Sequence, residues 1–210
     1  MSKKLEEIRV YLDPYTNILS EPNKIQLQMV EGDNVFKEAI QFLNDLPSLK
    51  ELQWDEYLSI IAQEHIDDIG PKGLLLYESS DGTPIEGRVS KYGNYIKDFG
   101  ENIDFGPNDA LGVIISLTLD DGEEERPHRE TLFNKDFQKI GIACGPHETE
   151  YKMCVMDFAY DFIPLNSVIK ELHNEINSLK NNEGKLKNEI ETKRKEVEEL
   201  KKKIILFKKN

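Results

Sequence analysis

A heptad repeat fills the last part of the chain and constrains its fold more than any other feature. Apolar residues recur there at alternating steps of four and three, from Leu165 to Phe207. β-Branched residues fill most of the first (a) positions and leucine fills most of the fourth (d) positions, which favours a parallel two-stranded coiled coil. We therefore predict a coiled-coil helix over residues 165–207. The residues expected in its dimer seam are Ile169, Leu172, Ile176, Leu179, Leu186, Ile190, Val197, Leu200 and Ile204.

Charged residues beside the seam agree with a parallel pair. Acidic residues occupy g positions and basic residues occupy the following e positions, so each g residue of one helix meets a basic e residue of its partner. The acidic residues are Glu175, Glu189 and Glu196, and the basic residues are Lys180, Arg194 and Lys201. We expect the helix to pair with a second copy of the chain or with another coiled-coil chain.

Two interruptions leave the arrangement of the tail open. Glu183 and Lys193 occupy seam positions, where a charge lowers stability but can fix the register or select a different partner chain. Residues 181–184 include Gly184, which costs about 1 kcal/mol inside a helix, and they could form the turn of a helical hairpin. The heptad phase continues unbroken through them, which favours one continuous helix.

The tail and the rest of the chain carry opposite net charges. Residues 165–210 hold 12 Lys+Arg and 8 Asp+Glu, a formal charge of +4, and residues 1–164 hold 15 and 32, a formal charge of −17. An acidic body repels nucleic acid, so no nucleic-acid partner is expected. No apolar run approaches the roughly 20 residues that cross a bilayer, so no integral membrane contact is expected either.

The first 164 residues show both helical and strand patterns, which indicates the α+β class. Helices are expected over residues 34–46, 54–69 and 84–92 and after a cap at Asn108, and strands over 8–12, 137–144 and 151–162. A turn joins the last two strands, so Cys144 could lie across from Cys154. Two cysteines form no disulfide framework, and we expect two reduced thiols in a cytoplasmic chain without a signal segment.

Four short segments in this region resemble the CAP superfamily, which groups cysteine-rich secretory proteins, insect antigen 5 and plant pathogenesis-related proteins. The resemblance spans residues 34–163 and implies an α-β-α sandwich around an antiparallel sheet. Residues 1–33 would then be an N-terminal extension and 165–207 a separate coiled coil. The similar segments lie at residues 49–65, 78–93 and 100–103 and from His128 to Ala143, and Phe158-Ala159 closes the pattern.

The resemblance also implies a cleft that, in many members, holds two histidines and two carboxylates suited to a divalent metal. Glu101 matches one acidic position and His128 matches one histidine, although Pro127 replaces the usual glycine. Asp120 or Asp121 is the nearest second acid, in an acidic run that we expect to be a solvated loop. Tyr77 stands at the other histidine position, and a tyrosine hydroxyl with a pKa near 10 binds zinc poorly.

The predicted site is therefore an incomplete cleft of Tyr77, Glu101, Asp120 and His128, with no metal, no cofactor and no catalytic residue assigned. We expect a non-enzymatic scaffold protein that dimerises through its coiled coil and binds other proteins in the cytoplasm, in a cytoskeletal or ciliary assembly. The alternative is a metal-assisted hydrolase or protease that uses His128 and Glu101.

Overall fold

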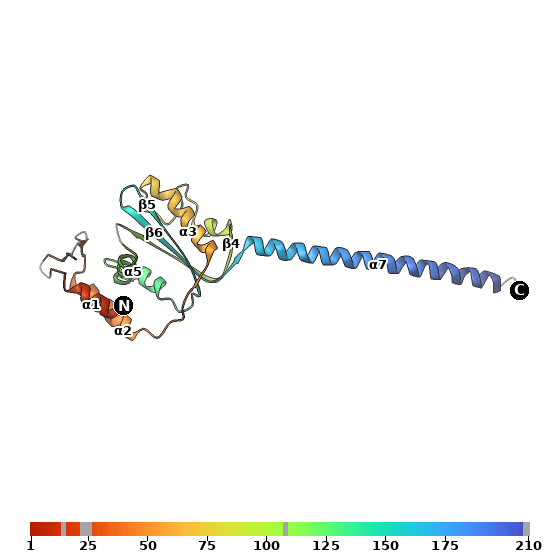
Figure 1. The fold of residues 1–210 in the computed structure, drawn as a ribbon, viewed down its shortest axis with the longest axis horizontal. Coiled ribbons are helices and arrows are strands. Elements are labelled where there is room, and N and C mark those ends of the chain that lie inside the picture. The colour runs from red at the N-terminus through yellow and green to blue at the C-terminus, as the bar shows by residue number, and fades with distance from the viewer. Residues whose placement is uncertain (14–15, 22–26, 107–108, 208–210) are drawn as a thin grey trace. The chain divides into compact units, whose positions relative to one another are not determined.

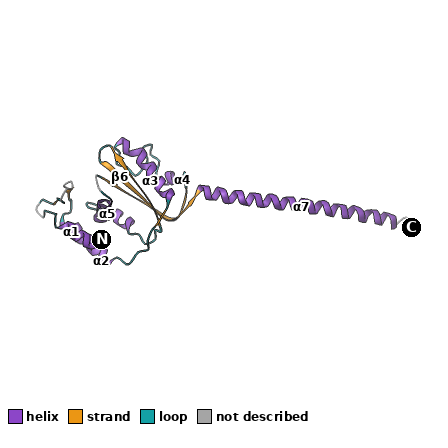
Figure 2. Ribbon diagram, in the orientation of Figure 1, coloured by secondary structure: helices purple, strands orange, loops and turns teal. Residues whose placement is uncertain are grey.

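The computed structural model describes residues 1–13, 16–21, 27–106 and 109–207. The chain forms two compact units, Met1–Pro164 and Leu165–Asn210 (Figure 1). We call the first unit the head. Figure 2 shows that the head combines helices and strands, whereas the described part of the second unit is a single helix.

A four-stranded sheet forms the centre of the head. Its strand order is β3 (Gln53–Trp54), β5 (Lys139–His147), β6 (Tyr151–Pro164) and β4 (Gly93–Phe105). The β5–β6 and β6–β4 pairs are antiparallel, and the short β3–β5 pair is parallel. The mixed α and β class and the predicted β5–β6 hairpin are confirmed. β4 was not predicted as a strand, because residues 94–98 are exposed and show no apolar alternation.

Helices cover both faces of this sheet. α3 (Glu56–Ile69) packs on one face, where Ala62 and Ile66 lie against Met153 and Val155 of β6. On the other face, α5 (Ala110–Leu119) packs against the intervening β6 residues, including Phe158. Alternate residues of a strand point to opposite faces, so β6 supplies apolar side chains to both layers. Two short helices, α4 (Ile85–Ser90) and α6 (Pro127–Leu132), complete the head beside the edge strand β4.

The described residues among the first 45, which we call the N-terminal lobe, pack onto the rest of the head. Their helices α1 (Ser2–Arg9) and α2 (Asp33–Asp45) share an apolar cluster that includes Ile115 and Leu119 of α5. Two short strands, β1 (Ile18–Leu19) and β2 (Leu27–Gln28), pair within the lobe. The predicted strand at residues 8–12 is wrong, because Leu5 and Ile8 lie three residues apart and meet α2 from one face of a helix.

The two cysteines form a disulfide. Cys144 of β5 and Cys154 of β6 lie directly opposite each other in the sheet register and are bonded. The predicted facing of the two residues is confirmed, and the prediction of two reduced thiols is wrong. Antiparallel pairing holds the two Cα atoms 4.1 Å apart, which brings the sulfur atoms together.

The tail is one helix, α7 (Leu165–Phe207), which continues through Gly184 without a break. The hairpin alternative is therefore wrong. The predicted seam residues from Ile169 to Val197 are 44–61% exposed. The side chains of Leu200 and Ile204 lie outside the described residues. No described helix is both long and apolar enough to cross a membrane.

Candidate functional site

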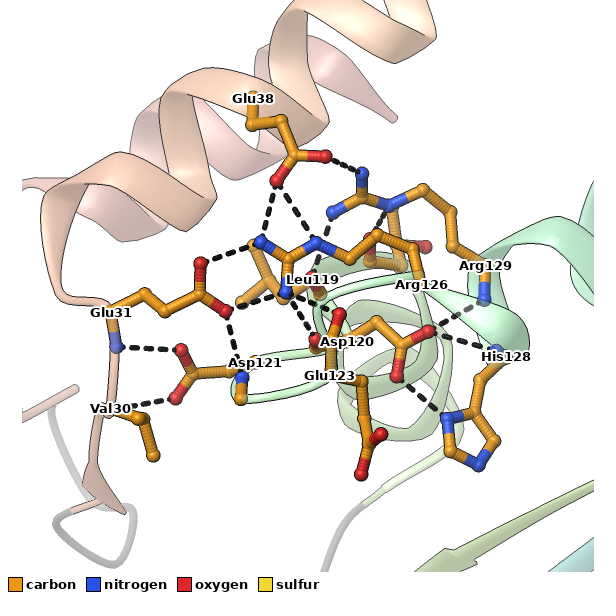
Figure 3. Close-up of polar contacts among 12 residues, drawn as sticks. Val30, Glu31, Glu38, Leu119, Asp120, Asp121, Glu123, Arg126, His128 and Arg129 are labelled. Carbon is orange, nitrogen blue, oxygen red and sulfur yellow. Dashed lines mark hydrogen bonds and ion pairs between the residues drawn. The ribbon is translucent and has the colours of Figure 1, made fainter.

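Three of the four predicted site residues form a hydrogen-bonded chain. His128 Nδ1 lies 2.6 Å from Asp120 Oδ1, and His128 Nε2 lies 2.7 Å from the Tyr77 hydroxyl. The other oxygen of Asp120 accepts hydrogen bonds from the backbone N–H groups of His128 and Arg129 (Figure 3). Asp120 therefore fixes both the imidazole ring and the first turn of α6.

Local backbone geometry places Asp120 where it can make these contacts. Asp120 ends α5 in the left-handed conformation, with φ 53°, and Arg126 reaches φ 51° just before α6 begins. L-residues adopt this conformation at a cost, so surrounding contacts must hold it. The amide of Asn102 on β4 adds one such contact, because it donates to the His128 carbonyl at 2.8 Å.

The electrostatics of these three hydrogen-bonded residues favour the charged form of His128 and the neutral form of Tyr77. The hydrogen bond to Asp120 raises the pKa of His128. Burial raises the pKa of Asp120, but hydrogen bonds from His128 and from the backbone of Arg129 outweigh it and lower that pKa overall. Burial and the nearby carboxylate of Glu101 raise the pKa of Tyr77 to about 12. The Tyr77 hydroxyl therefore keeps its proton at neutral pH and is a hydrogen-bonding group rather than a nucleophile.

Glu101, the fourth predicted residue, belongs to a separate buried cluster. Its Oε2 accepts from Arg88 Nη2 at 2.5 Å, and Arg88 Nη1 also donates to the Tyr77 carbonyl at 2.8 Å. Asp157 lies opposite Glu101 in the β4–β6 register and is fully buried. Burial and the neighbouring carboxylate of Glu101 raise the pKa of Asp157 well above its usual value, which disfavours its charged form.

Sequence reasoning gave no role to Arg88 or Asp157. Arg88 lies in the segment 78–93 that resembles the family, and nothing in that segment assigns it a role. The available signal for Asp157 was a carboxylate in the middle of the apolar β6 pattern, where an uncompensated charge is costly.

The N-terminal lobe holds the loop that joins Asp120, at the end of α5, to His128 in α6 (Figure 3). Glu31 accepts two hydrogen bonds from Arg126, at 2.5 and 2.6 Å. Glu38 accepts from Arg126 at 2.7 Å and from Arg129 at 2.8 Å. The loop after α5, which was expected to be solvated, is therefore bound to the N-terminal lobe. Asp121 accepts hydrogen bonds from the backbone N–H groups of Val30 and Glu31, and Asp120 is only 5% exposed.

The donor set does not favour a metal centre. No group of three His, Cys, Asp or Glu side chains suited to a metal ion occurs in the described part of the chain. Glu101 is held by Arg88, and His128 is held by Asp120 and Tyr77, so the two predicted metal-site residues have different partners.

Two solved structures are similar. One is an outer surface protein of Borrelia burgdorferi, with 21% identity and a TM-score of 0.45, covering 60% of this chain and 86% of that chain. The other is an extracellular protein of Bacillus anthracis that contains an SCP domain, with 19% identity and a TM-score of 0.42, covering 60% and 39%. No curated protein matches the sequence.

A family model matches the central part of the chain. The model of the cysteine-rich secretory protein family, CAP, matches residues 47–158, just over half of the 210 residues. The match contains Tyr77, Glu101, Asp120 and His128 and excludes both the N-terminal lobe and α7. The chain therefore belongs to the cysteine-rich secretory protein (CAP) family.

Proposed function

We propose that this protein is a non-enzymatic interaction protein whose CAP head is joined to a helix that pairs in parallel with the same helix of a second copy. One observation carries the proposal. Apolar residues recur along α7 as a stripe that Glu183 and Lys193 interrupt, and its described members from Ile169 to Val197 are about half exposed. Burying a leucine or isoleucine contributes about 1.5–3 kcal/mol, so covering the stripe is strongly favourable.

Charge complementarity supports a second copy in parallel. The exposed Glu175, Glu189 and Glu196 lie on one side of the stripe, and the exposed Lys180, Arg194 and Lys201 lie on the other. Such rows attract each other in a parallel pair. The site supports the non-enzymatic part of the proposal, because Tyr77 stays protonated and the polar groups of His128 are already bonded.

Light scattering after size exclusion measures the oligomeric state of the protein. The full chain should be a dimer and residues 1–164 should be a monomer. Leu186→Glu places a charge in the seam of both helices and should weaken the dimer at least about 100-fold.

Asn188→Glu is the matched control, because it adds the same charge on the outer face of α7 and should leave the dimer intact. A dimeric fragment 1–164 would assign dimerisation to the head and overturn the role of α7. A monomeric full chain would overturn self-pairing.

A further inference from the structure

Tyr77 and Glu101 line a hollow of about 360 Å³ in the head, and the proposed dimerisation through α7 does not use it. We propose that this hollow receives a lysine or arginine side chain of a partner polypeptide. The inference rests on the proposed function, because it names the kind of partner that the head of an interaction protein binds. It depends on three properties of the hollow: its walls, its charge and its access to solvent.

The walls suit the apolar stem and the charged end of a basic side chain. Tyr95 and Phe99 of β4 lie side by side, with ring centroids 5.4 Å apart and planes tilted by 43°. Pro84 and Ile85, where α4 begins, add aliphatic surface. Aromatic faces attract ammonium and guanidinium groups, and the aliphatic stem of lysine or arginine packs well on apolar side chains.

The charge of the hollow is negative and not compensated. Glu78 and Glu86 line it and are exposed, and neither carboxylate has a hydrogen-bond or ion-pair partner within the described residues. No lysine, arginine or histidine belongs to the described lining. Arg88 lies behind the wall with a side chain that is 1% exposed, and it is already paired with Glu101. An anionic ligand would be repelled here, and a neutral one would leave both carboxylates without a partner.

Access and long-range charge favour a polypeptide as the source of this cation. Tyr77 and Tyr95 line the hollow and remain 46% and 37% exposed, so a side chain can enter while its backbone stays outside. The formal charge of −17 on residues 1–164 attracts basic segments over a longer range than the hollow alone.

The test measures binding of short peptides to the full-length protein by amide NMR shifts. The probes are four blocked pentapeptides, acetyl-Gly-Ser-X-Ser-Gly-amide, in which X is lysine, arginine, norleucine or glutamate. The lysine and arginine peptides should shift the signals of Tyr95, Phe99 and Gly100, and the other two should not. Equal binding of the norleucine peptide would overturn the inference.

A double variant tests the carboxylates. Glu78→Gln with Glu86→Gln should weaken binding of the lysine peptide about 10-fold or more. Glu124→Gln with Glu125→Gln is the control, because it removes the same charge from exposed residues outside the hollow. Equal weakening by both double variants would mean general attraction to an acidic surface and would overturn the inference. Light scattering on the same samples separates the two proposals, because a dimer that binds no basic peptide overturns only this one.

Discussion

Asp120 and His128 form the contact whose energetics are easiest to measure at the scale of single residues. Their 2.6 Å hydrogen bond raises the pKa of His128 above the ordinary value of about 6.5. Asp120→Asn should therefore lower this pKa, as measured by NMR titration of the imidazole. Asp121→Asn is the control, because Asp121 bonds to backbone groups of the N-terminal lobe and should leave the pKa of His128 unchanged. An unchanged pKa in Asp120→Asn would contradict the assigned cause.

The same contact gives stability a pH dependence with a definite sign. The folded pKa of His128 lies above the unfolded one, so the protonated histidine contributes stability that is complete below about pH 6.5. That contribution is lost as pH rises through the folded pKa. The free energy of unfolding should therefore fall over this range in the wild-type protein and fall less in Asp120→Asn.

At the scale of elements, α2 holds the loop between α5 and α6 through Glu38. The nearly buried Arg129 side chain is 3% exposed and pairs with Glu38, which is 48% exposed. Glu38→Gln removes the charge that faces both Arg126 and Arg129, and it should lower the free energy of unfolding by about 1–2 kcal/mol. Urea denaturation measures the loss. Glu51→Gln, an exposed change outside this network, should stay within about 0.5 kcal/mol of wild type, and an equal loss there would contradict the role of Glu38.

Elements with a strong local pattern were predictable from sequence, and those without one were not. α3 and the β5–β6 hairpin were predicted because their apolar spacing repeats within a few residues. β4 was not, because most of its first half is exposed and shows no apolar alternation. Within the N-terminal lobe, α2 agrees with the helix predicted over residues 34–46, whereas α1 was not predicted, because this short helix is specified by packing on α2 rather than by its own pattern.

At the scale of the whole molecule, the Cys144–Cys154 disulfide links the neighbouring strands β5 and β6 of the central sheet. Such a bond persists where no reductant is present. Protein purified without reductant should therefore gain no mass from iodoacetamide until it is reduced. Reduction should lower the free energy of unfolding by about 2–3 kcal/mol, because the bond closes a short loop of the unfolded chain. Two alkylated cysteines before reduction would contradict the bond.

The sequence by itself determined the long tail helix, because a heptad repeat is local: the same spacing of apolar residues recurs every seven residues along it. Matching segments also led to the family and its mixed fold. Only the tertiary structure decided the contacts of the site. Tyr77 meets His128 across 51 positions, and Glu38 meets Arg129 across 91. Such pairs depend on how whole layers pack, because no local spacing brings distant side chains together. The disulfide likewise depends on the register of two strands, which places one cysteine opposite the other.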